Sequence, residues 1–176
     1  QFVMKAASDG NLYKDFSTTI YNGLANAPVS FATVDDTLFF CDGTQNIRTW
    51  DGAAGSTTAL ASPSATWASE SAYPQQLEVH GRGLSRRLWT WTSTNRIFGS
   101  EIITGSATAA IFGSANAVEF YVPTAFGENI TAIKDFGDTL FIFTNRKTYV
   151  LNDTDLDNAN WGIEDAQFTG GAAHWR

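Results

Sequence analysis

The chain has a single cysteine, Cys41, so no internal disulfide can form and nothing in the cysteine content signals secretion. Cys41 ends an apolar run beside Asp42, whose charge raises a thiol pKa, so we expect a small buried hydrophobe rather than a nucleophile. No stretch approaches the roughly 20 apolar residues that cross a bilayer. No signal peptide or lipidation motif is visible, and we expect no membrane insertion.

Charge is also scarce. Charged residues make up 16% of the chain, and 18 acidic against 11 basic side chains give a net charge of -7. An acidic chain gains nothing by displacing counterions from a nucleic-acid backbone, which argues against sequence-specific nucleic-acid binding. Aromatic residues reach 14%. Low charge with many aromatics favours a surface covered by neighbouring subunits, with an aromatic-rich β core as the alternative.

The chain also lacks the residue patterns typical of catalytic sites. Its two histidines, His80 and His174, lack the spacing of a zinc site. No Ser-His-Asp order or G-x-S-x-G elbow occurs. Asp35 and Asp36 are adjacent, so their side chains point apart and cannot flank one glycosidic bond, and turn formation suits them better. A propeller hydrolase therefore lacks a catalytic pair, and we expect no enzyme.

A segment that occurs twice dominates what is present. Residues 34–40 and 136–142 read almost the same, each with a polar turn that leads into a very apolar strand. A looser third copy occupies residues 85–91. The leucines of the three copies, Leu38, Leu88 and Leu140, fall about 50 residues apart, which is the scale of one four-stranded propeller blade.

Strand signals predominate over helical periodicity, because short β-branched and aromatic runs alternate with turn residues. The expected strands are 2–5, 11–14, 29–31, 37–41, 46–50, 76–80, 87–91, 95–100, 118–122, 129–134, 139–144 and 147–151. The Ser/Thr/Ala-rich connector 53–73 is expected to be an extended loop. The tail 152–175 is expected to be acidic and loop-like as far as 167–168.

These patterns predict an all-β, β-propeller-like fold with three to four hairpin-rich blades, either an open partial propeller or a fragment of a larger one. A β-sandwich built from the same meanders is the alternative. We expect a single β-repeat domain over residues 1–176 whose ends are cut from something longer. Its expected units are approximately 1–28, 29–60, 76–122 and 128–176.

One acidic segment has the spacing of a calcium-binding loop. Counting from Asp153, carboxylates fall at positions 1, 3, 5 and 12, which are Asp153, Asp155, Asp157 and Glu164. Asn158 stands where the sharp turn prefers glycine, and strands rather than helices flank the loop. The alternative is an acidic surface loop without a cofactor.

Two tryptophans are candidates for stacking on a sugar. Trp89 and Trp91 alternate along a strand, so both face the same side of it. Core packing is the other use of these rings, because large aromatic side chains are usually buried.

Several strings resemble a repeat in virion proteins of tailed bacteriophages. In that repeat a strand of the form n-d-x-L-y-f-x-D-G precedes a y/w-D-G turn, and an l-x-v-h-x-x-R-L-w strand precedes an r-i-y-x-S strand. The matching segments of this chain are 36–43, 48–52, 77–89, 96–100 and 130–143. The resemblance covers about residues 1–151, and an insertion at 81–85 lengthens one loop relative to the pattern.

The resemblance implies a non-enzymatic structural component of the virion tail, of the nozzle or packaged-DNA-stabilising type. Such proteins form rings of identical copies, commonly six-fold, next to portal, adaptor or tail proteins, and they retain and conduct DNA. The protein would be made in the cytoplasm of a host bacterium. The alternative function is a carbohydrate-binding β-propeller module that recognises a receptor or glycan.

Overall fold

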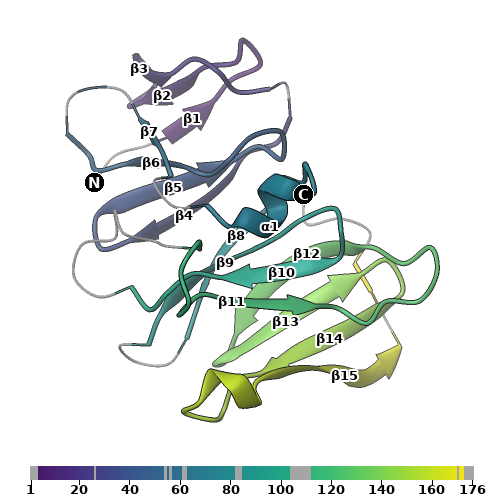
Figure 1. The fold of residues 1–176 in the computed structure, drawn as a ribbon. Coiled ribbons are helices and arrows are strands. Elements are labelled where there is room, and N and C mark those ends of the chain that lie inside the picture. The colour runs from purple at the N-terminus through teal and green to yellow at the C-terminus, as the bar shows by residue number, and fades with distance from the viewer. Residues whose placement is uncertain are drawn as a thin grey trace.

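The computed structural model describes residues 4–25, 27–53, 55, 57–60, 63–81, 85–103, 112–169 and 171–172. Within these ranges the protein is almost entirely β, with four antiparallel sheets, one short α-helix and one 3₁₀ turn. Each sheet is a meander, because its strands follow one another along the chain and each pairs with the next. The four sheets follow one another from the first at the top to the fourth at the bottom of Figure 1.

The first sheet has three strands, β1 (Met4–Ala6), β2 (Leu12–Lys14) and β3 (Thr18–Tyr21). The second comprises β4 (Ser30–Val34), β5 (Thr37–Cys41), β6 (Arg48–Trp50) and β7 (Thr58–Ala59). The third comprises β8 (Leu77–His80), β9 (Arg87–Trp91), β10 (Arg96–Gly99) and β11 (Val118–Tyr121). The fourth comprises β12 (Ile130–Phe136), β13 (Thr139–Thr144), β14 (Lys147–Asn152) and β15 (Gly162–Thr169).

The polar turn of the repeated segment is a tight hairpin with left-handed backbone at both central positions. Asp35 and Asp36 have φ of 44° and 62°, and Gly137 and Asp138 have φ of 59° and 64°. Two consecutive positive φ values match the twist of the strands that such a turn joins, and Gly and Asp tolerate them well. The repeat therefore specifies the β4–β5 and β12–β13 hairpins through local backbone chemistry.

Neighbouring sheets pack face to face through three apolar clusters. The cluster between the first and second sheets contains Leu12, Ile20, Leu24, Leu38, Phe40 and Trp50. The cluster between the second and third sheets contains Val34, Phe39, Cys41, Ile47, Leu60, Trp67, Leu77, Leu88, Phe98, Ile103 and Phe112. The cluster between the third and fourth sheets contains Trp89, Trp91, Ile97, Val118, Val122, Ile130, Ile133, Leu140, Ile142, Tyr149 and Leu151. The second and third sheets are thus covered on both faces.

The two covered faces explain why β5 is apolar at nearly every position. Leu38 and Phe40 point into the cluster shared with the first sheet. Phe39 and Cys41 point the other way, into the cluster shared with the third sheet. All five residues of β5 are buried, as expected of a strand with neighbours on both faces. In β13 buried and half-buried residues alternate, and the half-buried rings of Phe141 and Phe143 stack with centroids 6.3 Å apart.

The three repeat leucines occupy equivalent places. Leu38, Leu88 and Leu140 are each the second residue of the second strand of a four-stranded sheet. Each also lies in the cluster formed with the preceding sheet. The period of about 50 residues therefore marks one sheet of the stack.

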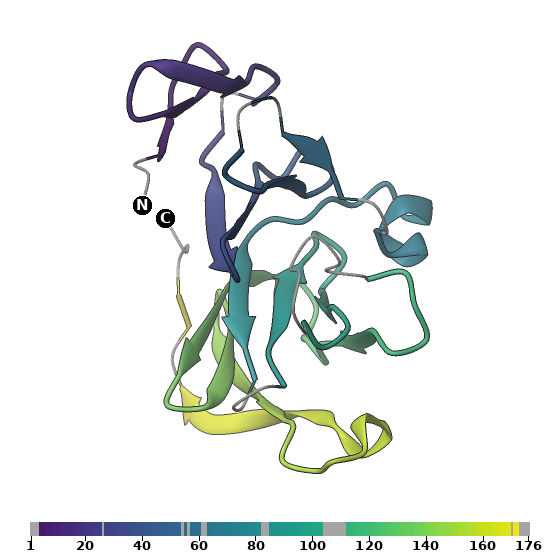
Figure 2. The same ribbon diagram turned by 90° about the vertical axis from the view of Figure 1, so that its left-hand side faces the viewer.

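The first strands of the three larger sheets are neighbours, with β8 between β4 and β12. Figure 2 shows these strands side by side near the middle of the molecule. Polar side chains join them. The backbone N–H of Leu77 donates to Ser30 Oγ at 2.9 Å. The side-chain amide of Gln76 donates to the carbonyl of Ile133 and accepts from its N–H, both at 2.9 Å.

The expectation of an extended loop over 53–73 is wrong at two points, because strand β7 and helix α1 (Ala65–Ser69) lie inside it. Ser64 caps this helix by accepting from Thr66 N at 3.1 Å, a favoured N-cap contact. The fully buried Trp67 holds the helix on the core, with its indole N–H donating to Asn46 Oδ1 at 2.9 Å.

Three strands were missed by the sequence analysis: β3, β7 and β15. The tail expected to be loop-like contains the eight residues of β15, which complete the fourth sheet beside β14. These strands lie beside another strand on the outside of a meander, where half-exposed polar residues hide the strand pattern. Pairing with a neighbour therefore decides their conformation.

Candidate functional site

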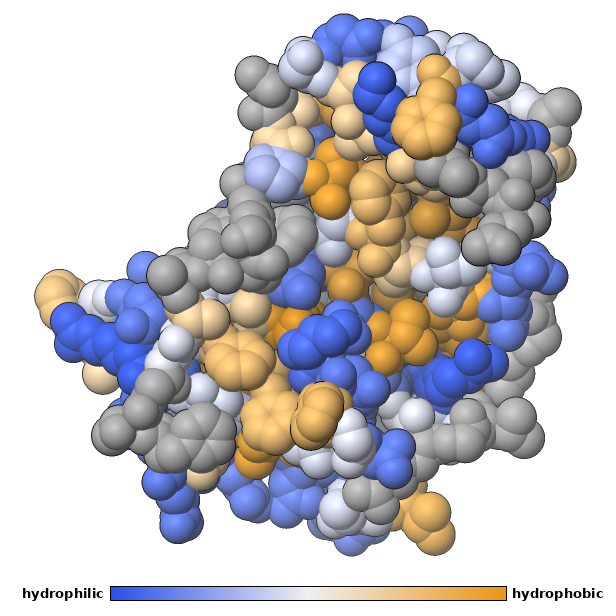
Figure 3. Space-filling view, turned by 180° about the vertical axis from the view of Figure 1, so that it is seen from behind, coloured by the Kyte–Doolittle hydropathy of each residue, from blue (hydrophilic) through white to orange (hydrophobic). Residues whose placement is uncertain are grey.

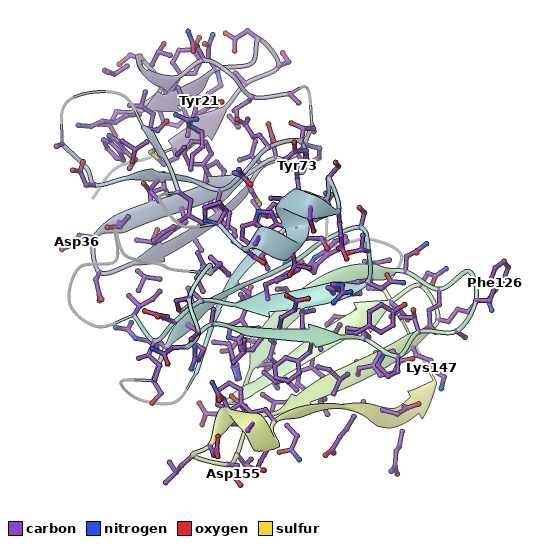
Figure 4. All side chains as sticks on the ribbon, viewed as in Figure 1. Tyr21, Asp36, Tyr73, Phe126, Lys147 and Asp155 are labelled. Atoms are coloured by element: carbon purple, nitrogen blue, oxygen red, sulfur yellow. The ribbon has the colours of Figure 1, made fainter. Side chains whose placement is uncertain are left out.

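A cavity of about 310 Å³ opens between the third and fourth sheets. Its walls come from the β8–β9 loop, β9, the segment after β10, and the β14–β15 loop. They are formed by Gly81, Ser85, Arg87, Ile102, Asp153, Thr154, Asp155, Leu156, Asp157, Asn158 and Trp161. Figure 4 shows Asp155 at the lower end of the fourth sheet, where the chain turns before β15.

The acidic wall of the cavity is a tightly bonded loop. Asp155 accepts from Asp157 N at 2.9 Å and from Asn160 Nδ2 at 3.1 Å. Asp157 accepts from Ala159 N at 3.0 Å and so caps the 3₁₀ turn η2 (Asn158–Asn160). The indole N–H of Trp161 donates to the backbone carbonyl of Asp155 at 2.8 Å. Asx-type bonds of this kind fix the loop without help from the core.

Arg87 of β9 lies on the opposite wall, and only 5% of its surface is exposed. Its Nη1 donates to the carbonyls of Ser100 and Asn116, and its guanidinium carbon lies 5.4 Å from the centroid of the Trp161 ring. Its Nε is buried and has no partner among the described residues. Burial lowers the pKa of Arg87, against the opposing charge of Glu101.

Behind this wall, the imidazole of His80 joins the two sheets. Its Nδ1 lies 2.5 Å from Asp135 Oδ1 on β12, and its Nε2 lies 2.9 Å from Asp153 Oδ2 in the β14–β15 loop. Burial alone would disfavour the charged imidazole. The hydrogen bonds and charges of Asp153 and Asp135 outweigh burial, so the pKa of His80 is raised above its ordinary value. A protonated His80 donates one hydrogen bond to each carboxylate.

The chemistry open to these groups follows from their bonds. Both ring nitrogens of His80 are occupied by carboxylates, so neither is available as a general base in this arrangement. Cys41 lies elsewhere, 1% exposed in the core. Its burial confirms the expectation of a small buried hydrophobe, and burial and, secondarily, the charge of Asp42 raise its thiol pKa.

The four carboxylates expected to wrap calcium have different partners. Asp153 bonds to His80, while Asp155 and Asp157 bond within the loop. Glu164 lies on β15, opposite Val150, and accepts from Asn152 Nδ2 at 2.7 Å. Within the described ranges, no group of three or more His, Cys, Asp or Glu side chains is placed to hold a metal ion. Calcium binding by this loop stays a prediction, which a calcium titration would test.

The two tryptophans proposed to stack on glycans lie in the core. Trp89 is 1% and Trp91 8% exposed, between the third and fourth sheets. The Trp89 ring packs against His80, with centroids 6.2 Å apart. Both rings face the same side of β9, as the alternation predicts, but that side is covered by the fourth sheet and leaves little ring surface for a sugar.

A larger cavity, of about 660 Å³, lies beside the first and second sheets. Met4, Leu38 and Trp50 are its apolar lining residues, and Asp36 and Asp51 also line it. Asp36 belongs to the β4–β5 turn, as the sequence analysis expected of the Asp35–Asp36 pair. Apolar side chains also gather in a hollow on the back of the molecule, between its upper and lower halves (Figure 3).

Sequence reasoning missed Arg87 and Trp161, which line the smaller cavity, and the role of His80, which bonds to Asp153 of its wall. His80 was considered only as a zinc ligand, and its partners lie 55 and 73 residues away. Arg87 lies on β9 of the third sheet and Trp161 in the β14–β15 loop of the fourth. The one available signal was that Arg87 precedes Leu88 in an otherwise apolar strand, where a buried charge needs partners.

Comparison with known proteins gave no match. No family model matches the chain, and no curated protein or solved structure does so at a significant level. Among the described residues, no helix has the length and apolar character to cross a membrane. The assignment of function therefore depends on the arrangement of the sheets and of the side chains between them.

Proposed function

We propose that this protein is a non-enzymatic structural component of a phage tail, and that its four sheets are successive blades of an open, propeller-like stack. One observation carries the proposal: four contiguous meanders pack through three apolar faces, with the first strands of the larger sheets as neighbours. The resemblance of the repeat to virion tail proteins supplies the biological setting. A stack of this kind offers a rigid wall.

The distribution of side chains supports a structural role. Large aromatic side chains, including Trp67, Trp89 and Phe39, are buried and pack between sheets. Large apolar groups also remain outside: Phe126 is 103% and Phe136 77% exposed. Figure 4 shows Phe126 projecting from the end of the loop between the third and fourth sheets. Exposed apolar groups of this size suit contacts with other subunits.

In this proposal copies of the chain assemble into a ring, six-fold as in the proteins that the repeat resembles, beside portal, adaptor or other tail proteins. A closed ring requires head-to-tail interfaces, in which two different faces of the protein meet. The net charge of -7 suits a channel through which DNA passes, because a negative wall does not hold a negative polymer.

Mass photometry of the purified protein and immunogold labelling of phage particles test the proposal. We expect a closed oligomer in solution and gold particles at the tail. A matched variant, Phe136→Ser, should weaken the oligomer if this exposed ring lies in the interface, whereas Thr18→Ser on the exposed part of β3 should not. A strictly monomeric protein that is absent from purified particles would overturn the proposal.

A further inference from the structure

We propose that the outer face of the fourth sheet pairs with the same face of a second copy of this chain, about a two-fold axis parallel to the strands. The outer face is the side of this sheet that points away from the third sheet, and the fourth sheet lies at the bottom of Figure 1. This contact goes beyond the proposed tail function and does not depend on it. A closed head-to-tail ring would use other faces of the chain.

The first argument is the position of aromatic side chains on this face. Leu140 of β13 points into the cluster shared with the third sheet, so Phe141 and Phe143 point to the outer face. The equivalent residues of the preceding sheets, Phe39 of β5 and Trp89 of β9, are covered by the next sheet. Phe141 and Phe143 are only half-buried and belong to none of the three apolar clusters of the described residues. The fourth sheet therefore presents a surface of the kind that another sheet covers elsewhere in this chain.

The second argument is the order of charges across this face. One residue from each strand forms a central row in which every residue is paired directly with the next: Lys134 of β12, Phe141 of β13, Val150 of β14 and Glu164 of β15. The row has a cation at one end, two apolar side chains in the middle and a carboxylate at the other end. A two-fold axis parallel to the strands lays β12 of one copy over β15 of the other. Lys134 of each copy then faces Glu164 of the other, so unlike charges meet at both ends of the row.

Both charged groups of the central row have bonding capacity for a second copy. Lys134 is 64% exposed and its ammonium bonds to Glu78 at 2.8 Å, which uses one of three donors. Glu164 is exposed and accepts one hydrogen bond from Asn152 Nδ2 at 2.7 Å. An ionised carboxylate accepts several hydrogen bonds at its two oxygens. The bonds within one chain therefore leave room for an ion pair between two chains.

The third argument is the shape of the neighbouring row, which fits under the same axis. Its ends are Phe136 of β12, paired with Thr139, and Gly162 of β15, paired with Asn152. Phe136 is 77% exposed. Gly162 has no side chain, and beyond its chain neighbours no heavy atom lies within 4 Å of where a Cβ would stand. The axis that opposes unlike charges also brings Phe136 of one copy over Gly162 of the other, so an exposed ring meets an open position.

Charge also selects among the possible arrangements. A two-fold axis across the strands would lay β12 on β12 and β15 on β15, so Lys134 would face Lys134 and Glu164 would face Glu164. Continuing the stack head to tail would lay β1 of the next copy over β12 and bring Lys5 close to Lys134. The outer face of the first sheet is also polar, because Lys5 pairs there with Tyr13 and Tyr13 with Thr19. Of these three arrangements, only the axis parallel to the strands opposes unlike charges.

The size of the face predicts a weak contact. Its four strands, spaced about 4.8 Å apart and about six residues long with a rise of about 3.4 Å, give a footprint of about 400 Å² per copy. A standard interface buries about 800 Å² per partner. We therefore expect a dissociation constant in the micromolar range, and weaker association at high salt because exposed ion pairs are screened.

Sedimentation velocity of the full chain from about 5 to 500 μM, a range that brackets micromolar dissociation constants, tests the contact. We expect the mass to double reversibly with concentration, from monomer to dimer or from one ring to a pair of rings. Glu164→Lys should weaken this step at least tenfold, because like charges then meet at two symmetric places. The control Asp165→Lys makes the same change of charge on the other face of β15 and should associate as the wild type does. Circular dichroism establishes that each variant is folded.

Chemical cross-linking tests the geometry. The variants Phe136→Cys and Gly162→Cys are made as separate proteins, one with a mass tag, and are treated with a bismaleimide whose reach of about 10 Å matches the spacing of stacked sheets. We expect a covalent dimer when the two variants are mixed. Neither variant alone should cross-link, because the two copies of one position lie three strand spacings, about 14 Å, apart sideways. Cys41 is 1% exposed and should not react.

Three results would overturn the inference. The first is a mass that does not change up to about 500 μM, the upper limit set by the expected affinity. The second is that folded Glu164→Lys and Asp165→Lys associate equally well. The third is a cross-link in one variant alone, or none in the mixture, which would assign the face to another arrangement or another occupant. Absence of the protein from phage particles would remove the tail function and leave this contact standing.

Discussion

His80 and Arg87 are directly paired across β8 and β9, so their side chains share the face of the third sheet that meets the fourth. Asp135 of β12 and Asp153 of the β14–β15 loop both pair with His80, whereas Arg87 donates to the backbone carbonyls of Ser100 and Asn116. The interface is therefore apolar around Trp89 and Trp91 and ionic at the end where His80 lies. Because His80 titrates, we expect the stability of the contact between the third and fourth sheets to depend on pH.

We predict that His80→Gln destabilises the protein by about 3 kcal/mol near pH 6, because removing one member of a buried ionic group leaves the others uncompensated. The raised pKa of His80 sets the direction of the pH dependence. The stabilisation is complete below the unfolded-state value of about 6.5 and is lost as pH rises through the folded-state value.

Urea unfolding from pH 5.5 to 9, in buffer with EDTA to remove divalent cations, measures this effect. The stability difference between wild type and His80→Gln should shrink as pH rises. Lys134→Gln, which removes an ion pair between Lys134, 64% exposed, and Glu78, serves as a control and should change stability little. A stability difference that stays constant over the whole range would contradict the assignment of His80 as the titrating group.

The side-chain amide of Gln76 makes the pair of hydrogen bonds that the backbone of a neighbouring strand would otherwise make. It satisfies both the N–H and the carbonyl of Ile133, next to the irregularity in the β12–β13 register between Ile130 and Ala132. Gln76→Ala should cost about 2 kcal/mol, since two buried backbone groups lose their partners. Gln75→Ala, one residue earlier and less buried, should cost less. Thermal and urea unfolding of both variants compare the two, and an equal loss would refute this role.

Trp67 anchors the only α-helix in the described part of the chain. Its ring centroid lies 5.2 Å from that of Phe98, in an edge-on arrangement, and 5.1 Å from that of Phe112. Trp67→Ala should lower the free energy of unfolding by about 4 kcal/mol, the usual cost of removing a large buried aromatic side chain. Trp67→Phe should lose less, mainly the bond to Asn46. Denaturant titration followed by circular dichroism measures both, and a loss below about 1 kcal/mol for Trp67→Ala would contradict the described packing.

Cys41 should be unreactive in the folded protein. It is 1% exposed, and burial followed by the charge of Asp42 raises its pKa, so the thiolate that attacks Ellman's reagent is scarce. We expect no colour at pH 8 in native buffer and one thiol per chain in 6 M guanidinium, since the sequence holds a single cysteine. Rapid reaction of the native protein would show that the second sheet opens readily.

The fold could be predicted from the sequence to the extent that its signals are local. The polar turns at 35–36 and 137–138, and the apolar strands after them, are set by neighbouring residues. Helix α1 escaped notice because its five residues form too short a period to stand out, and burial of Trp67 decides its existence. The strand β15 depends on its pairing with β14.

The candidate site was less accessible to sequence reasoning for a different reason. The acidic loop was recognised, but its partners were not. His80 and Arg87 reach it only because the third and fourth sheets stack. Contacts between residues more than 50 positions apart depend on how two sheets are placed, and a single sequence does not record that placement. Trp89 and Trp91 are a second example. The sequence predicted that both rings face the same side of their strand, but it did not predict that the fourth sheet covers that side.

Each sheet of the stack is made from one uninterrupted stretch of chain. A duplication or deletion of about 50 residues in the gene would therefore add or remove a whole layer while leaving the pairing inside every other layer intact. Length variation among natural descendants of such a chain should occur in steps of one layer. Laboratory circular permutants should likewise tolerate new ends between layers better than inside one.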